Sequence, residues 1–134
     1  MENEQQLQKF LADFSEMKGS KILVHGGGIM ATQLSEKLGY KTTMLDGRRI
    51  TDENAIKVIV MTYAGLLNKN IVAGLQAQGA QALGLCGADG GSIISRRRAA
   101  TPIDYGFVGD VEQVNTKFIT SLLEQGFIPV FSAI

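Results

Sequence analysis

The chain has 134 residues, 13 basic and 13 acidic side chains, 16 glycines and an ordinary share of apolar residues. This composition is typical of a folded α/β domain with one hydrophobic core, and nothing in it indicates disorder. Because the net charge is zero, the basic run 96–98 is interpreted as a solvated strand or loop, and we expect no nucleic-acid partner. One cysteine excludes a disulfide framework. We find no signal peptide and no apolar run approaching the roughly eighteen residues of a membrane span, so we expect a cytoplasmic protein with no membrane contact.

The first quarter of the chain predicts a helix, a strand and a second helix. Apolar residues at helical spacing over 7–14 predict the first helix, which ends near Gly19. The apolar run 22–24 predicts a short strand. Three glycines at 26–28 follow it and lead into a helical pattern over 30–38.

The middle of the chain predicts a small hairpin and two helical stretches. The turn signal Asp46-Gly47 lies between β-like runs, which indicates a hairpin over 42–50. Thr51 is the predicted N-cap of a long helix that runs through Tyr63. A second helical stretch is predicted over 68–75.

The last part of the chain predicts a strand at 81–85, a second hairpin from 92–98 and 105–114, a helix at 116–123 and a strand at 127–131. Strands separated by helices of this length indicate a largely parallel sheet covered on both faces. The fold class is therefore α/β.

The glycine junction at 26–28 is the first candidate site. A strand that ends in glycines and opens into a helix brings backbone N–H groups together at the positive end of the helix dipole, with no Cβ in the way. Such a junction suits an anion. We therefore expect a ligand with phosphate or carboxylate groups.

Five motifs together resemble one family in order and spacing. They are His25-Gly-Gly-Gly28, Asp46-Gly-Arg-Arg-Ile-Thr-Asp52, Asn68-Lys-Asn-Ile-Val72, Gly84-Leu-Cys-Gly-Ala-Asp-Gly90 and Gly106-Phe-Val-Gly109. The chain from about Lys21 to its last residue resembles the acetylglutamate kinases of the amino-acid kinase family.

The resemblance implies a three-layer α/β/α sandwich of two lobes. In that family the first lobe holds an N-acyl-L-glutamate and forms a homodimer, and the second holds ATP with Mg²⁺. The reaction is phosphorylation of the side-chain carboxylate, an early step of arginine biosynthesis. Such transfer depends on positioning and charge neutralisation more than on covalent help.

The resemblance also implies that residues 1–134 are the substrate lobe alone. The family begins with a strand ending in Lys-Gly-Gly, which this sequence lacks, and its later lysine and aspartate lie beyond residue 134. The apolar run 127–134 at the end of the chain suggests a cut inside a domain. We therefore expect no catalytic residue in this chain, and a fragment that binds substrate without activity.

Within the resemblance, Gly27 and Gly28 match the substrate-contacting glycines, and Gly26 completes the phosphate-cradling turn. We expect a Cβ at Gly27 or Gly28 to block the ligand. Arg49 matches the arginine that grips the α-carboxylate of the substrate, a task suited to a guanidinium fork. Strand alternation predicts that Arg48 points the other way.

Other residues are assigned structural roles. His25, at the end of a strand, is interpreted as a satisfied structural group, because an ionised carboxylate needs no base. Asp89 is interpreted as capping its own turn rather than binding metal, and no metal site is expected. Cys86 is interpreted as a core thiol. Asn68 and Lys69 belong to helix packing or to a dimer surface, and the sequence does not choose between them.

Two alternatives stay open at this point. Residues 26–31 satisfy the dinucleotide fingerprint G-x-G-x-x-A, and Asp46 lies about the right distance on to hold a ribose, as in a Rossmann-type oxidoreductase domain. Against it, Asp46 lies in a predicted hairpin turn. The other alternative is a domain that only senses an amino acid or mediates assembly. The acyl group, the dimeric or hexameric state and feedback by arginine are not determined by the sequence.

Overall fold

Helices and strands alternate along the chain in the computed structural model, which describes residues 4–134. The helical elements are α1 (Glu4–Glu16), α2 (Gly28–Lys37), α3 (Glu53–Val60), the π-helical η1 (Met61–Leu67), α4 (Asn68–Ala77), the short 3-10 turn η2 (Asp89–Gly91) and α5 (Thr116–Glu124). The strands are β1 (Leu23–His25), β2 (Thr43–Leu45), β3 (Arg48–Ile50), β4 (Ala82–Leu85), β5 (Ile93–Arg97), β6 (Gly109–Val114) and β7 (Ile128–Ser132).

A parallel sheet with the strand order β1-β7-β4 forms the centre of the fold. Val130 of the middle strand lies beside Leu23 of β1 and beside Gly84 of β4. All five residues of β7 are buried, which explains the apolar run 128–131, and the buried hydroxyl of Ser132 donates to the carbonyl of Leu85. The predicted α/β class with a parallel sheet is confirmed.

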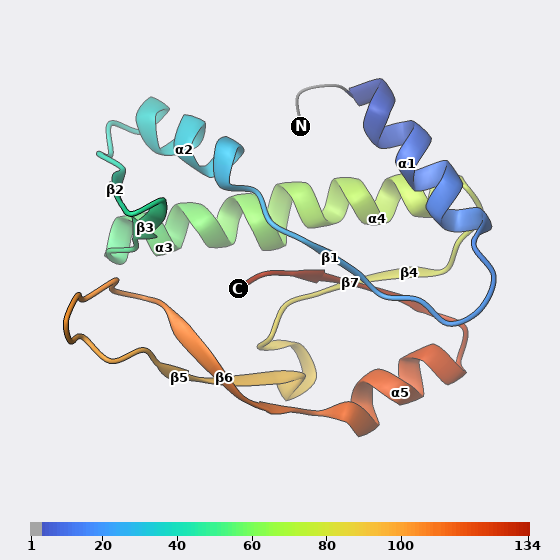
Figure 1. Ribbon diagram of the computed structural model, residues 1–134. Coiled ribbons are helices and arrows are strands. Elements are labelled where there is room, and N and C mark those ends of the chain that lie inside the picture. The colour runs from blue at the N-terminus through green and yellow to red at the C-terminus, as the bar shows by residue number, and fades with distance from the viewer. Residues whose placement is uncertain (1–3) are drawn as a thin grey trace.

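Helices cover both faces of this sheet. α1 and α4 lie on one side, and α5 lies on the other (Figure 1). Leu11 of α1 and Leu75 of α4 are fully buried in the first interface, and Leu122 of α5 packs with Phe131 of β7 in the second. Because full burial of one leucine contributes about 1.5–3 kcal/mol, these two interfaces hold the sheet in place.

The long helix differs from the sequence prediction. α3, η1 and α4 form one continuous helix from Glu53 to Ala77, so the expected division into two stretches is wrong. The π-helical segment carries the backbone past Gly65 without a break. The N-cap is also one residue later than predicted: Asp52 accepts hydrogen bonds from the backbone N–H groups of Asn54 (3.0 Å) and Ala55 (2.8 Å).

This fused helix corrects a second expectation. Its 25 residues are long and apolar enough, by length and composition, to cross a membrane, whereas no such stretch was expected from the sequence. Within the fold its inner residues Val58, Asn68 and Leu75 are buried. It thus lies where a core helix of a folded domain lies, packed on α1 and against the sheet.

The first hairpin, β2–β3, forms as predicted. Asp46 and Gly47 both have positive φ (49° and 74°), which a two-residue turn between twisted strands requires. The second hairpin, β5–β6, is shorter than predicted on its second strand. β6 begins at Gly109 and not at Tyr105, because residues 105–107 bond to Thr51 instead.

Candidate functional site at the glycine turn

The glycine turn connects β1 to α2 and leaves backbone donors free of side-chain caps. Gly27 is the N-cap of α2, and no side chain caps the helix there. The first helical hydrogen bond runs from the N–H of Ala31 to the carbonyl of Gly27 (2.9 Å). The N–H groups of Gly28, Ile29 and Met30 therefore precede the helical ladder and are the donors that an anion can use.

The three glycines of the turn differ in the space that a Cβ would find at each position. A Cβ on Gly27 would lie 2.9 Å from the ring of Tyr63 and collide with Leu67, both on the π-helical segment. A Cβ on Gly28 would make an ordinary contact with the hydroxyl of Tyr63 (3.7 Å), and one on Gly26 would meet no atom within 4 Å. Close packing of the turn on η1 thus explains Gly27 without any ligand.

Arg49 reaches this turn from the first hairpin, 21 residues away. Its Nη2 donates to the carbonyl of Gly28 (3.1 Å) and to Oγ1 of Thr32 (2.8 Å), and its Nη1 donates to Oγ1 of Thr42 (3.3 Å). Arg49 is half-buried, whereas Arg48 is exposed, as strand alternation predicts. The structure therefore brings a guanidinium to the first turn of α2.

A polar network lies behind the turn. The side-chain amide of Asn68, 1% exposed, donates to Nε2 of His25 (3.1 Å) and to the carbonyl of Val130 (2.8 Å), and its oxygen accepts from Nζ of Lys69 (3.1 Å). Nδ1 of His25 lies 2.9 Å from the carbonyl of Gly26. Because a carbonyl can only accept, Nδ1 carries the proton and Nε2 accepts from Asn68. His25 is thus a satisfied structural group, as predicted.

The role of Asn68 was left open by the sequence. Its burial assigns it to packing inside the domain, while Lys69 remains exposed. The sequence offered one signal for the burial of Asn68: it lies three positions before Ile71 and seven before Leu75, both of which are buried. Its partner His25 lies 43 positions away, and no local pattern predicts that pairing.

The glycine-rich loop after β4 has a turn structure. Asp89 accepts a hydrogen bond from the N–H of Cys86 (2.6 Å), which agrees with the predicted capping role. Cys86 is half-buried with a free thiol, so it is less enclosed than the expected core thiol. Among residues 4–134, no three His, Cys, Asp or Glu side chains converge in a way that could hold a metal ion.

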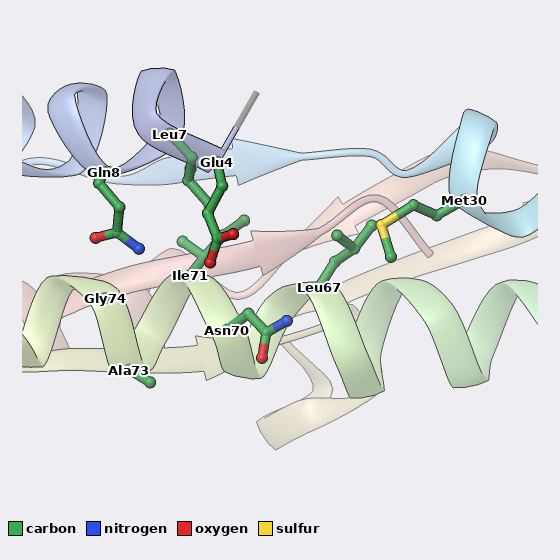
Figure 2. Close-up of a pocket in the computed structure, with 9 residues that line it drawn as sticks. All are labelled: Glu4, Leu7, Gln8, Met30, Leu67, Asn70, Ile71, Ala73 and Gly74. Atoms are coloured by element: carbon green, nitrogen blue, oxygen red, sulfur yellow. The ribbon is translucent and has the colours of Figure 1, made fainter. Parts of the chain in front are cut away.

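An open groove of about 450 Å³ lies next to the turn, between α1 and the long helix. Figure 2 shows the residues that line it: Glu4, Leu7, Gln8, Met30, Leu67, Asn70, Ile71, Ala73 and Gly74. Neither Arg49 nor a glycine of the turn lines it. The groove is therefore a separate feature, although it is lined by Met30 of α2 and by Leu67, against which Gly27 packs.

Comparison with known proteins decides the family. Residues 1–134 match the amino acid kinase family over the entire chain. The chain belongs to the amino acid kinase family. The sequence-based resemblance to this family is confirmed.

Within the amino acid kinase family, the chain is similar to curated acetylglutamate kinases. The chain is 54% identical over 132 residues to an acetylglutamate kinase of Phocaeicola vulgatus, covering 98% of the chain and 51% of that relative. It is 52% identical over 132 residues to an acetylglutamate kinase of Parabacteroides distasonis, covering 98% of the chain and 52% of that relative. The chain spans about half the length of these relatives.

A solved structure supports the fold of this amino acid kinase chain. The N-acetylglutamate synthase of Neisseria gonorrhoeae, solved with coenzyme A and N-acetyl-glutamate, superposes with a TM-score of 0.77 at 19% identity. The match covers 97% of this chain and 30% of that one. At this identity the likeness shows a shared fold.

Proposed function

We propose that this chain is the substrate lobe of an N-acyl-L-glutamate kinase of arginine biosynthesis. The complete enzyme would use ATP to phosphorylate the side-chain carboxylate of N-acetyl-L-glutamate or of another N-acyl-glutamate. Family membership and the names of relatives at 50–54% identity support this proposal. Because the chain spans about half of those relatives, we propose that it binds the substrate without completing the reaction.

The position of Arg49 at the glycine turn is the observation that carries the proposal. A substrate with carboxylates at both ends needs two cationic or N–H-rich subsites. The Arg49 guanidinium would grip the α-carboxylate, and the free N–H groups at the start of α2 would face the reacting carboxylate and the transferred phosphoryl group. The carbonyl of Gly28, which Arg49 now contacts at 3.1 Å, ties these two subsites together.

ATP and Mg²⁺ are proposed cofactors of the complete enzyme. The described residues 4–134 do not offer a cluster of carboxylates for the ion, so its ligands are not assigned to this part of the chain. When bound with ATP, Mg²⁺ would neutralise charge on the phosphates. The residues of this chain would act by orienting the acyl-glutamate.

We also propose that the protein is a homodimer in the cytoplasm. The long helix presents apolar side chains outward, with Val60 45%, Met61 51% and Leu66 51% exposed. An unpaired apolar surface on a helix of a folded domain suits a second protein surface. We propose that this helix contributes to the contact between two copies.

A titration followed by two-dimensional NMR tests the substrate assignment. N-acetyl-L-glutamate, ATP and NAD are added in turn to the 134-residue chain and to two variants, Arg49→Ala and Arg48→Ala. We expect saturable shifts at the glycine turn with the acyl-glutamate, retained in Arg48→Ala and lost in Arg49→Ala. Shifts with NAD alone would favour the dinucleotide alternative, although Asp46 lies in the β2–β3 turn and not at the end of a parallel strand.

The sensing alternative needs a separate measurement. The complete protein is assayed for formation of an acyl phosphate from N-acetyl-L-glutamate and MgATP. Binding of the acyl-glutamate without turnover in the complete protein would favour a domain that only senses the amino acid. We expect turnover.

A further inference from the structure

Residues 104–107 lie in the connection between β5 and β6, and backbone groups of this segment bond to Thr51, which is distant in the sequence. The N–H of Thr51 donates to the carbonyl of Tyr105 (2.9 Å), and the N–H of Phe107 donates to the carbonyl of Thr51 (2.8 Å). Together they form a parallel bridge outside the named strands. Thr51 is only 4% exposed, so losing the bridge would leave buried backbone groups unpaired.

Gly106 permits this close approach. Its φ is +75°, and a Cβ there would collide with the carbonyl oxygen of Thr51 and lie 2.8 Å from the carbonyl carbon. Backbone atoms cannot rotate out of the way as a side chain can. The N–H of Gly106 donates to Asp104 (2.8 Å), which pairs with Arg97 of β5 (3.3 Å) and so ties the segment to the second hairpin.

Thr51 lies two residues after Arg49, at the end of the first hairpin. That hairpin has three residue pairs, too few to hold a position by itself. The place of Arg49 relative to the glycine turn therefore depends on where the chain is held at Thr51. We propose that residues 104–107 form a strap that positions Arg49 for the anionic ligand of the glycine turn. The identity of the ligand in this inference rests on the proposed function, whereas the claim that the strap positions Arg49 does not.

The substitution Gly106→Ala tests the strap, with Gly126→Ala as its matched control. Gly126 also has a positive φ (+81°), but a Cβ there meets no atom within 4 Å, so it reproduces the backbone strain without the collision. We expect Gly106→Ala to weaken binding of N-acetyl-L-glutamate about tenfold, as for the loss of a hydrogen bond to a charged group. Gly126→Ala should change it less than about twofold.

Two further readouts separate positioning from general stability. In the Arg49→Lys background, which keeps measurable binding, Gly106→Ala should weaken binding by a smaller factor than in the wild-type chain, because both changes act through one side chain. By NMR without ligand, Gly106→Ala should speed hydrogen exchange at Thr51 and Phe107 and shift the Arg49 Nε signal toward that of a solvated arginine.

The outcomes separate this inference from the proposed function. If the Thr51 and Phe107 amides are released while the Arg49 signal stays unchanged, the strap does not position Arg49 and the inference is overturned. If the wild-type chain binds no acyl-glutamate, the proposed function fails, yet the Arg49 signal still decides the strap. If Gly106→Ala does not fold, Asp104→Ala replaces it, and we expect the same Arg49 shift with about a threefold loss of binding.

Discussion

The two hairpins share an architecture and differ in how they are supported. β2–β3 has three residue pairs, and its long-range hydrogen bonds come from Arg49. β5–β6 has five residue pairs, and two ion pairs support it: Arg96 with Glu112 between the strands, and Arg98, just after β5, with Asp110 of β6. The hairpin with the candidate ligand-binding residue is therefore the one with less support of its own.

This difference places the weaker hairpin at the candidate site. A short two-stranded hairpin is marginal in water and takes its position from its neighbours. β2–β3 is held by the side chain of Arg49, which bonds to α2, and by the bridge from Thr51, just after β3, to residues 105–107. A ligand that draws Arg49 away from Gly28 would disturb few other contacts.

Replacing Arg49 with lysine should have the largest effect. An ammonium group keeps the charge but cannot form the guanidinium fork, so binding of N-acetyl-L-glutamate should fall about thirtyfold. Arg48→Lys, on the exposed side of the same strand, is the control and should change binding less than about twofold. Calorimetric titration measures both. Equal losses in the two variants would contradict a special role for the position of Arg49 at the turn, and no loss in either would show that positive charge alone is enough.

Replacing Gly27 with alanine tests how closely the start of α2, to which Arg49 bonds, packs on η1. Because the new Cβ would meet Tyr63 and Leu67, the free energy of unfolding should fall by about 1–3 kcal/mol. Gly26→Ala places its Cβ in open space and should stay within about 0.5 kcal/mol of wild type. Urea unfolding compares them. A similar loss in both variants would contradict the packing explanation for Gly27.

Thr32→Val removes one of the contacts that hold Arg49. The shape of the side chain is kept, but Nη2 loses its partner at 2.8 Å and retains the carbonyl of Gly28. We expect about a threefold weaker affinity for N-acetyl-L-glutamate. Thr43→Val, at an exposed position of β2, is the control. Unchanged binding in Thr32→Val would show that Arg49 keeps its place without this contact.

The smallest effect is expected in the second hairpin. The hydrogen bond from Arg98, together with its charge, lowers the pKa of Asp110 below the ordinary carboxyl value. The stabilisation is therefore complete above that ordinary value, near pH 4, and is lost as the pH falls through the lowered pKa. Because the pair is partly exposed to solvent, added salt should reduce this stabilisation.

Asp110→Asn measures this contribution. The variant should unfold at lower urea than wild type at pH 6, and the two midpoints should converge toward pH 3. A difference that is the same at both pH values would show that the ion pair is not its source. The Arg49 signal and acyl-glutamate binding should remain unchanged, since the bridge to Thr51 uses backbone groups of residues 105–107.

Much of the fold was readable because its signals are local. The apolar run 127–131 predicted β7, the Asp46-Gly47 pair predicted the β2–β3 turn, and the glycines at 26–28 predicted the junction of β1 with α2. Each depends on backbone freedom or on side-chain periodicity within a few residues. The resemblance added Arg49, and the structure places that residue at the turn.

By itself, the sequence determined the α/β class, the family and the residues around which a site could form. Tertiary structure alone decided that Gly27 is required by Tyr63, that Asn68 pairs with His25, and that Gly106 lies against Thr51. It also decided that one helix runs through 53–77 where two were predicted. These features depend on segments that are far apart in the chain, so the close approach of their atoms leaves no periodic pattern in the sequence.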